Sequence, residues 1–366
     1  SWAADRVALV GRAPHSSLST LEGAWAGGSR FVMGACDCRT FNVRRLILVR
    51  VYFNMGRCMS RRYSHRDIRV EETGLIWPEL LAIDTNTAVV SDTSGFLRRV
   101  DIETGTMVKS PCTRLPKIPT GNQLRSPAAD NEGQIIAAAT RSGWGCIWDW
   151  QTNDLEQLHP TYGGPVNSVA LSPGGGYLAL GTGFYPLNPS HRVAAKVEIW
   201  SRDPSWTFEE VVALPGVCVD WLAWFEESPV LVAATGRRAQ NGGNLTFLDM
   251  SSLKAERAAE ISAWPFEVCG AEDYDPVVAV AGDGLHIYRM DGPDGDESFN
   301  VEHDLRGACW ADGRVVTVSG QILNYESNVV IDQLAPLGNC VQIVPRPGGG
   351  FVGISSEGIM RIWEDD

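Results

Sequence analysis

The chain has 366 residues and a formal net charge of -13, with 44% hydrophobic and only 20% charged residues. The negative charge argues against nucleic acid or an anionic membrane as the main partner, because both select a cationic surface. The 38 glycines, 20 prolines and 13 tryptophans favour many short strands over helices, and no apolar run approaches the ~18 residues of a membrane span.

The first apolar segments predict three strands. Residues 7–10 (Val-Ala-Leu-Val) indicate an isolated strand, which must find a partner elsewhere because a lone strand leaves its backbone unpaired. Residues 21–25, a glycine-containing turn at 26–29 and residues 30–34 predict a tight hairpin. We interpret this hairpin as the start of the first repeat.

An arginine-rich segment, residues 39–70, follows the hairpin. From Arg39 to Arg69 there are nine arginines, no lysine and a single acid, Asp67. The segment lies within the first repeat or is inserted in it; an insertion, a disordered arm and an out-of-frame stretch would each give this composition. It also holds aromatic residues such as Tyr52 and Phe53, so an alternative function is nucleic-acid binding through this segment.

From Pro78 onward a set of short apolar strands recurs along the chain. Each copy has a third strand that ends in an aromatic, charged or polar residue, and these ends are spaced by 36 to 51 residues. That period is typical of a four-stranded propeller blade and not of a helical solenoid. The predicted third-strand ends are Asp101, Asp149, Trp200, Asp249, Arg289, Tyr325 and Trp363.

These copies resemble WD40 repeats. One copy has the Ser-Pro-x-Gly turn at residues 172–175, and another has a third strand that ends in Trp148-Asp149. The resemblance covers nearly the whole chain but is degenerate, since Trp200 and Trp363 are not followed by Asp. It implies an all-β, closed β-propeller that serves as a rigid, non-catalytic platform for a protein or peptide partner. Packing of Trp, Val and Ile is expected to carry more of the cohesion than in typical members.

The two ends of the chain are predicted to pair in one blade. The last copy, from Cys340, has only three strands, and residues 7–10 supply a spare one that would pair beside residues 358–363 and close the ring. Counting the arginine-rich segment as part of a blade gives eight blades, and treating it as an insertion gives seven. We therefore expect one domain over residues 1–366, with four-stranded antiparallel blades.

The cysteines indicate a reducing compartment. Nine cysteines are spread thinly along the chain, and four of them fall early in successive repeats, where apolar strand residues are expected. We interpret these four as small buried side chains, and we expect a cytoplasmic protein. They are Cys218, Cys269, Cys309 and Cys340.

No motif indicates a catalytic centre or a cofactor. The glycine-rich stretches 173–176 and 347–350 precede strands and lack lysine, so they predict hairpin turns and not phosphate loops. The acidic stretch 291–297 lacks the spacing of a calcium loop and predicts a solvated hairpin. We expect no enzyme, no cofactor, no metal and no small-molecule substrate; the alternative is a hydrolase or metal-dependent enzyme with its site at the central channel.

The functional prediction rests on the position of loops. In a WD40-like blade, the loop between the second and third strands and the loop that enters the first strand open on the same face. Two such second-to-third loops are long here, residues 181–192 and 236–243, and insertions of this kind either mark the binding side or are tolerated surface excursions. Aromatic and arginine side chains dominate interface energies. The predicted partner-binding residues are Arg141, Tyr162, Tyr185, Arg237, Arg238 and Trp264.

Overall fold

The structure is a computed structural model. It describes residues 19–24, 30–35, 63–71, 78–91, 95–111, 124–140, 143–162, 165–183, 194–224, 230–237, 242–261, 265–271, 274–281, 284–289, 297–301, 303–311, 313–324 and 327–365. Side chains are described from Tyr63 onward within these ranges, except for residues 237, 256–258, 265–281 and 289. Within the described ranges, no helix has the length and apolar character needed to cross a membrane.

The chain divides into two compact units, residues 1–60 and 61–366. In the first unit, β1 (Ser19–Ala24) pairs antiparallel with β2 (Arg30–Ala35), so the predicted hairpin is present. The predicted strand at 7–10 and residues 39–62 of the arginine-rich segment lie outside the described residues.

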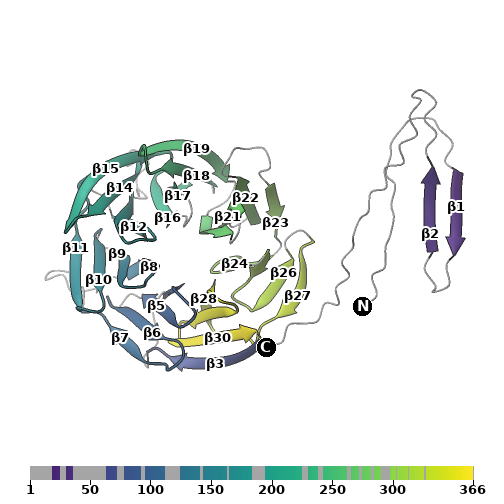
Figure 1. Cartoon of the computed structure of the whole chain (residues 1–366), viewed down its shortest axis with the longest axis horizontal. Coiled ribbons are helices and arrows are strands. Elements are labelled where there is room, and N and C mark those ends of the chain that lie inside the picture. The colour runs from purple at the N-terminus through teal and green to yellow at the C-terminus, as the bar shows by residue number, and fades with distance from the viewer. Residues whose placement is uncertain are drawn as a thin grey trace. The chain divides into compact units, whose positions relative to one another are not determined.

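The second unit is an all-β propeller built from four-stranded antiparallel blades (Figure 1). Its described residues form seven such sheets, and in six of them the strands follow one another in chain order. The six sheets are β4 (Glu79–Ala82), β5 (Thr87–Ser91), β6 (Leu97–Asp101) and β7 (Met107–Lys109); β8 (Leu124–Ala129), β9 (Ile135–Thr140), β10 (Gly145–Asp149) and β11 (Asp154–Leu158); β12 (Val166–Leu171), β13 (Tyr177–Thr182), β14 (Ala195–Arg202) and β15 (Trp206–Leu214); β16 (Cys218–Trp224), β17 (Val230–Arg237), β18 (Gly242–Asp249) and β19 (Lys254–Ile261); β20 (Pro265–Ala271), β21 (Tyr274–Ala281), β22 (Gly284–Arg289) and β23 (Glu297–Asn300); β24 (Cys309–Ala311), β25 (Arg314–Val316), β26 (Gln321–Asn324) and β27 (Val329–Gln333). The seventh sheet is β28 (Cys340–Pro345), β29 (Phe351–Ser355), β30 (Ile359–Asp365) and β3 (Tyr63–Arg69).

The expected count of eight blades is therefore wrong, because the described residues form seven four-stranded sheets. The seven predicted third-strand ends each fall within two residues of the end of a third strand, from β6 at Asp101 to β30 at Asp365. The extra copy was counted from the N-terminal hairpin and the arginine-rich segment. In the described residues, β1 and β2 pair only with each other, so they form a two-stranded sheet and not a blade.

The strand that completes the last sheet is β3, and not residues 7–10 as predicted. β3 pairs antiparallel with β30 along its whole length, for example His65 with Trp363. Beside this pair, Arg361 donates to both carboxylate oxygens of Asp67, at 2.5 and 2.7 Å. β3 is an outer strand with a mostly polar, half-exposed sequence, so it lacks the apolar alternation on which the prediction relied.

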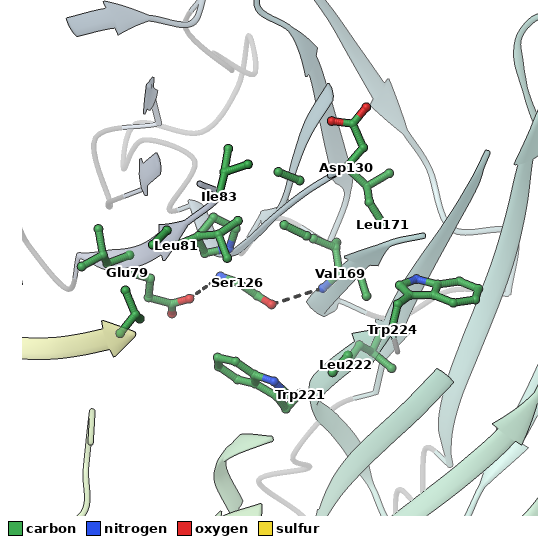
Figure 2. A pocket seen from close by; sticks show the side chains of 18 of the residues that line it. Glu79, Leu81, Ile83, Ser126, Asp130, Val169, Leu171, Trp221, Leu222 and Trp224 are labelled. Carbon is green, nitrogen blue, oxygen red and sulfur yellow. Dashed lines mark hydrogen bonds between the residues drawn. The ribbon is translucent and has the colours of Figure 1, made fainter. Parts of the chain in front are cut away.

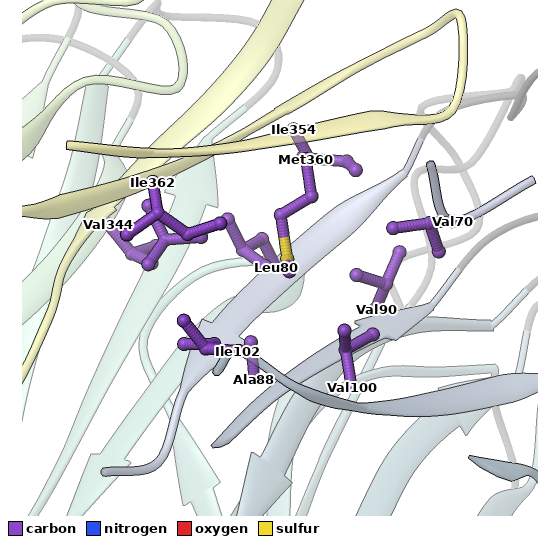
Figure 3. Close-up of a cluster of buried hydrophobic side chains, with 11 residues drawn as sticks. Val70, Leu80, Ala88, Val90, Val100, Ile102, Val344, Ile354, Met360 and Ile362 are labelled. Atoms are coloured by element: carbon purple, nitrogen blue, oxygen red, sulfur yellow. The ribbon is translucent and has the colours of Figure 1, made fainter. Parts of the chain in front are cut away.

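Apolar side chains hold the sheets together. In the described part of the chain, each cluster of buried side chains bridges two consecutive sheets. The cluster in Figure 3 joins the last sheet to the first, with Ile354 and Met360 from the one facing Leu80 and Val90 from the other. Each first strand also contacts the first strand of the next sheet, and β28 contacts β4.

Local turn chemistry sets the ends of the strands. The carboxylate of Asp149 accepts hydrogen bonds from the N–H groups of Gln151 and Thr152, at 3.0 and 3.1 Å, in the turn from third to fourth strand. Asp101 and Asp249 cap the corresponding turns of their own sheets. The predicted hairpin turn at 173–176 is confirmed between β12 and β13, where Gly175 has a φ of +66° that favours glycine.

The cysteine interpretation is confirmed where side chains are described. Cys218 and Cys309 are buried and form no disulfide among the described residues, Cys340 is partly buried, and Cys146 on β10 is a further buried thiol. Burial raises the pKa of the Cys146 thiol to about 12, so this thiol remains protonated and behaves as a small apolar side chain.

The ion pair between Asp67 and Arg361 gives a pH-dependent prediction. The hydrogen bond from Arg361 holds the pKa of Asp67 below its ordinary value, so the pair stabilises the fold above pH 3.8, and this contribution is lost as the pH falls through the lowered pKa. Asp67→Asn should lower Tm at pH 7 by about 1–3 °C, a modest value because the carboxylate is partly exposed.

Thermal unfolding between pH 2 and pH 7 measures this effect. The matched control is Asp154→Asn on β11, an exposed acid without a described ion pair. A Tm difference between Asp67→Asn and the parent protein that persists unchanged at pH 2 would contradict the assignment.

Candidate functional site

The innermost strands are tied to one another by side chains that bond to the backbone of the next strand. Gln342 of β28 accepts a hydrogen bond from Leu80 N on β4, at 2.8 Å. At the next junction Glu79 accepts from Ser126 N on β8, and the Ser126 hydroxyl accepts from Val169 N on β12, at 3.3 Å. At a fourth junction, Ser168 donates to Val219 O on β16, at 3.3 Å. We call these contacts the inner junction bonds.

Irregular backbone at the start of the innermost strands positions these groups. The pairing between first and second strands shifts register between Arg125 and Ala128, and similar shifts occur in β12, β16, β20 and β28. Ser126 itself has a φ of +52°, uncommon for a residue other than glycine. A β-bulge redirects side chains locally, which here turns Ser126 toward both neighbouring strands.

A cavity of about 340 Å³ lies between these strands. Its described lining residues come from β4, β8, β12, β16 and β28 and the turns that follow them. Most are apolar, and Trp221 and Trp224 of β16 contribute two indole rings. Figure 2 shows the bonds from Glu79 to Ser126 and from Ser126 to Val169 in succession along the wall. We call this space the central cavity.

Glu79 is one of the two carboxyl groups in the described lining of the central cavity, and its side chain is partly buried. Burial raises its pKa above the ordinary value, and the hydrogen bond from Ser126 N and the charge of Arg125 only partly oppose this shift. Arg125 donates to the side-chain oxygen of Asn167, so its guanidinium is engaged elsewhere. Among the described residues, Glu79 accepts one hydrogen bond through Oε2, and no donor reaches Oε1.

Asp130 is the second carboxyl group in the lining, and it has a structural role. Its Oδ1 accepts from Ile135 N at 3.1 Å and so caps the turn from β8 to β9. Burial raises the pKa of Asp130, and backbone N–H groups of the turn partly reverse the shift. In the described residues, no three His, Cys, Asp or Glu side chains group in a way that could hold a metal ion.

A second candidate site surrounds Tyr162 in the connection from β11 to β12. The N–H groups of Thr161 and Tyr162 donate to the two carboxylate oxygens of Glu198, at 2.9 and 2.8 Å, and Glu198 is fully buried. The phenol ring remains 51% exposed. It lies 5.6 Å from the Phe208 ring and 5.4 Å from Lys196 Nζ, measured to ring centroids.

Of the six predicted partner-binding residues, Tyr162 has a described side chain. Arg237 is the last residue of β17, but its side chain is not described, and the other four lie outside the described residues: Arg141, Tyr185, Arg238 and Trp264. Strand pairing brings the start of a first strand, the end of the second and the start of the third to the same level, as for Val166, Thr182 and Lys196. The connections that carry the six residues therefore leave their sheets at the same end.

The sequence did not reveal the inner junction bonds or Glu79. A signal was nevertheless present, because a polar residue precedes a short apolar run in several first strands. Such a run follows Glu79 in β4, Ser168 in β12 and Gln342 in β28. Similar positions in a single strand are ordinary strand starts, so only their repetition from blade to blade could have identified them.

Comparison with known proteins adds no further assignment. No protein-family model matches the chain, and no curated protein matches it. The function is therefore inferred from the geometry of the two candidate sites.

The first prediction for the site concerns the inner junction bonds. Gln342→Ala removes the acceptor of Leu80 N, and leaving a buried N–H without a partner should lower the free energy of unfolding by about 1–3 kcal/mol. Urea unfolding measures the loss. Gln157→Ala on the outer strand β11 is the control and should stay within about 0.5 kcal/mol of the parent. Equal losses in the two variants would contradict the role given to Gln342.

The second prediction concerns the charge of Glu79. Its folded-state pKa is raised, so the folded state binds the proton more tightly, and stability declines as the pH rises from 4.5 through the raised pKa. Glu79→Gln keeps an oxygen that accepts from Ser126 N but carries no charge. Its Tm should equal that of the parent near pH 4 and exceed it at pH 8. A Tm below that of the parent at pH 8 would contradict this account.

Proposed function

We propose that the protein is a non-catalytic interaction platform that binds a protein or peptide partner at the end of the propeller where Tyr162 lies. The observation that carries this proposal is the anchoring of an exposed aromatic ring by a buried carboxylate. Because Glu198 holds the backbone of Thr161 and Tyr162, the point from which the ring projects is fixed before a partner arrives. Preorganised aromatic side chains lose little conformational entropy on binding and are enriched among interface hot spots.

The surroundings of Tyr162 support the same function. Phe208 and Lys196 flank the ring, which gives an apolar contact and a cation beside one exposed phenol. A patch of this composition suits a partner segment that combines an aromatic or aliphatic side chain with an acidic one. Arg141, Tyr185, Arg237, Arg238 and Trp264 belong to connections at the same end of their sheets, and they extend the proposed surface.

The likeness to WD40 propellers is part of the proposal. In its favour are the four-stranded blades, the turn-capping Asp149 that follows Trp148, and the hairpin turn after Ser172. A closed WD40-like ring would give the platform the rigidity that preorganised recognition needs. We further propose that it acts in the cytoplasm.

The test compares two tyrosines of equal exposure on one sheet. Tyr162 is 51% exposed and precedes β12, whereas Tyr177 is 49% exposed and begins β13 at the opposite end of the same sheet. A partner identified by affinity capture would be purified and titrated against both variants by calorimetry. Tyr162→Ala should raise the dissociation constant about 30-fold, as for an interface hot spot. Tyr177→Ala should raise it less than about twofold.

Thermal unfolding of the two variants serves as the control for folding. Both tyrosines are half exposed, so both Tm values should stay within about 2 °C of the parent. Equal affinity of the two variants for the partner, with both proteins folded, would place the binding surface elsewhere and contradict the proposal.

A further inference from the structure

The central cavity has the properties of a ligand site that no sequence motif announces. Its volume of about 340 Å³ lies within the range of roughly 300–1,000 Å³ that is common for small-molecule sites. Its wall is mainly apolar, with two indole rings and a small number of polar groups, as is usual for such sites. The sequence argued against a small-molecule substrate because catalytic motifs are missing, but a binding cavity needs no such motif.

The charge of the central cavity selects the class of ligand. Two carboxyl groups, Glu79 and Asp130, belong to the described lining, and no Lys, Arg or His is among those lining residues. Each carboxyl accepts one backbone hydrogen bond through one oxygen, but Figure 2 shows the Asp130 carboxylate pointing away from Glu79 and Trp221, so Glu79 is the group considered for a ligand. A cation entering the cavity would meet carboxyl groups and no basic side chain in the described wall, while the charge of Arg125 acts on Glu79 from outside the lining.

Comparison of the inner junction bonds shows that the charge of Glu79 is not needed for its structural contact. Gln342 and Ser126 accept the equivalent backbone N–H of the next strand with neutral oxygens. Glu79 makes the same contact with one of its two oxygens, at the cost of partly desolvating a carboxyl group. A bound cation would compensate that cost, whereas a neutral ligand would not.

The geometry also discriminates among cations. A guanidinium group prefers both oxygens of a carboxylate, but Oε2 of Glu79 already accepts from Ser126 N. A metal ion needs several oxygen, nitrogen or sulfur ligands, and the described residues provide no such group. An alkylammonium ion needs one carboxylate oxygen and an apolar or aromatic wall, and Trp221 and Trp224 supply that wall.

We propose that the central cavity binds a small alkylammonium ion, with the ammonium group at Oε1 of Glu79 and the hydrocarbon part against the indole rings of β16. This inference does not depend on the interaction surface at Tyr162. It assigns a second function to the protein, the recognition of a compact organic cation within the propeller.

The experiment is a titration of the full chain with n-butylammonium chloride at pH 8, followed by calorimetry or ligand-observed NMR. The parent protein should bind it saturably. Glu79→Gln should bind it at least about tenfold more weakly, since a charge-assisted hydrogen bond is lost. Glu156→Gln, which removes an exposed carboxylate from the outer strand β11, should bind it as the parent does.

Two further measurements make the result specific. Butan-1-ol, which has a similar shape but no charge, should bind at least about tenfold more weakly than butylammonium. Affinity for butylammonium should fall as the pH is lowered through the pKa of Glu79, because the protonated carboxyl has no charge, and Glu79→Gln should show no such dependence.

Three outcomes would overturn the proposal. They are no saturable binding of butylammonium by the parent protein at pH 8, equal affinity of the parent and folded Glu79→Gln for it, and equal affinity of the parent for butylammonium and butan-1-ol. None of these outcomes bears on the Tyr162 surface, so failure here leaves the proposed interaction function to its own test.

Discussion

The structure depends on the way its innermost strands satisfy their backbone. A first strand has a sheet partner on one side only, so alternate N–H and C=O groups point toward the centre, where there is no further strand. Side chains of the preceding innermost strand fill this role: Gln342 for Leu80, Glu79 for Ser126, and Ser126 for Val169. These bonds link consecutive sheets, as the apolar clusters do. The centre of the propeller is therefore fixed by polar contacts as well as by packing.

This arrangement explains which parts of the fold were predictable. Third-strand ends such as Asp149 carry local signals, since the carboxylate caps the turn within a few residues, and these positions were predicted correctly. The pairing of β3 with β30 joins residues almost 300 positions apart in sequence, Asp67 and Arg361, and β3 is polar on most of its length. A strand that lacks an apolar pattern and pairs over such a separation leaves no local trace. The apolar pattern of residues 7–10 led instead to the prediction that they complete the last sheet.

The residues of the two candidate sites also differ in how far the sequence could predict them. Tyr162 was predicted because an aromatic residue in a connection is conspicuous in any sequence, but its anchor was not. Glu198 lies within β14, and it is fully buried where it holds the backbone of the loop. Glu79 was not predicted for a related reason, since its structural contact is with Ser126 of the next sheet. Contacts between sheets depend on how the sheets are placed in the propeller. The residue pattern of a single strand carries no information about that placement.

Cohesion in this propeller also differs from what its degenerate repeats suggested. Apolar packing does fill the interfaces between sheets, with Trp148 and Trp363 fully buried, as predicted. Yet charged side chains are buried as well: Arg98 of β6 is 1% exposed and pairs with Glu71 at 2.9 Å. Such pairs contribute little net stability, but removing one partner is costly, so they restrict which sheet can pack against which. The Arg98–Glu71 pair therefore adds a specific contact between the first and last sheets to the apolar packing.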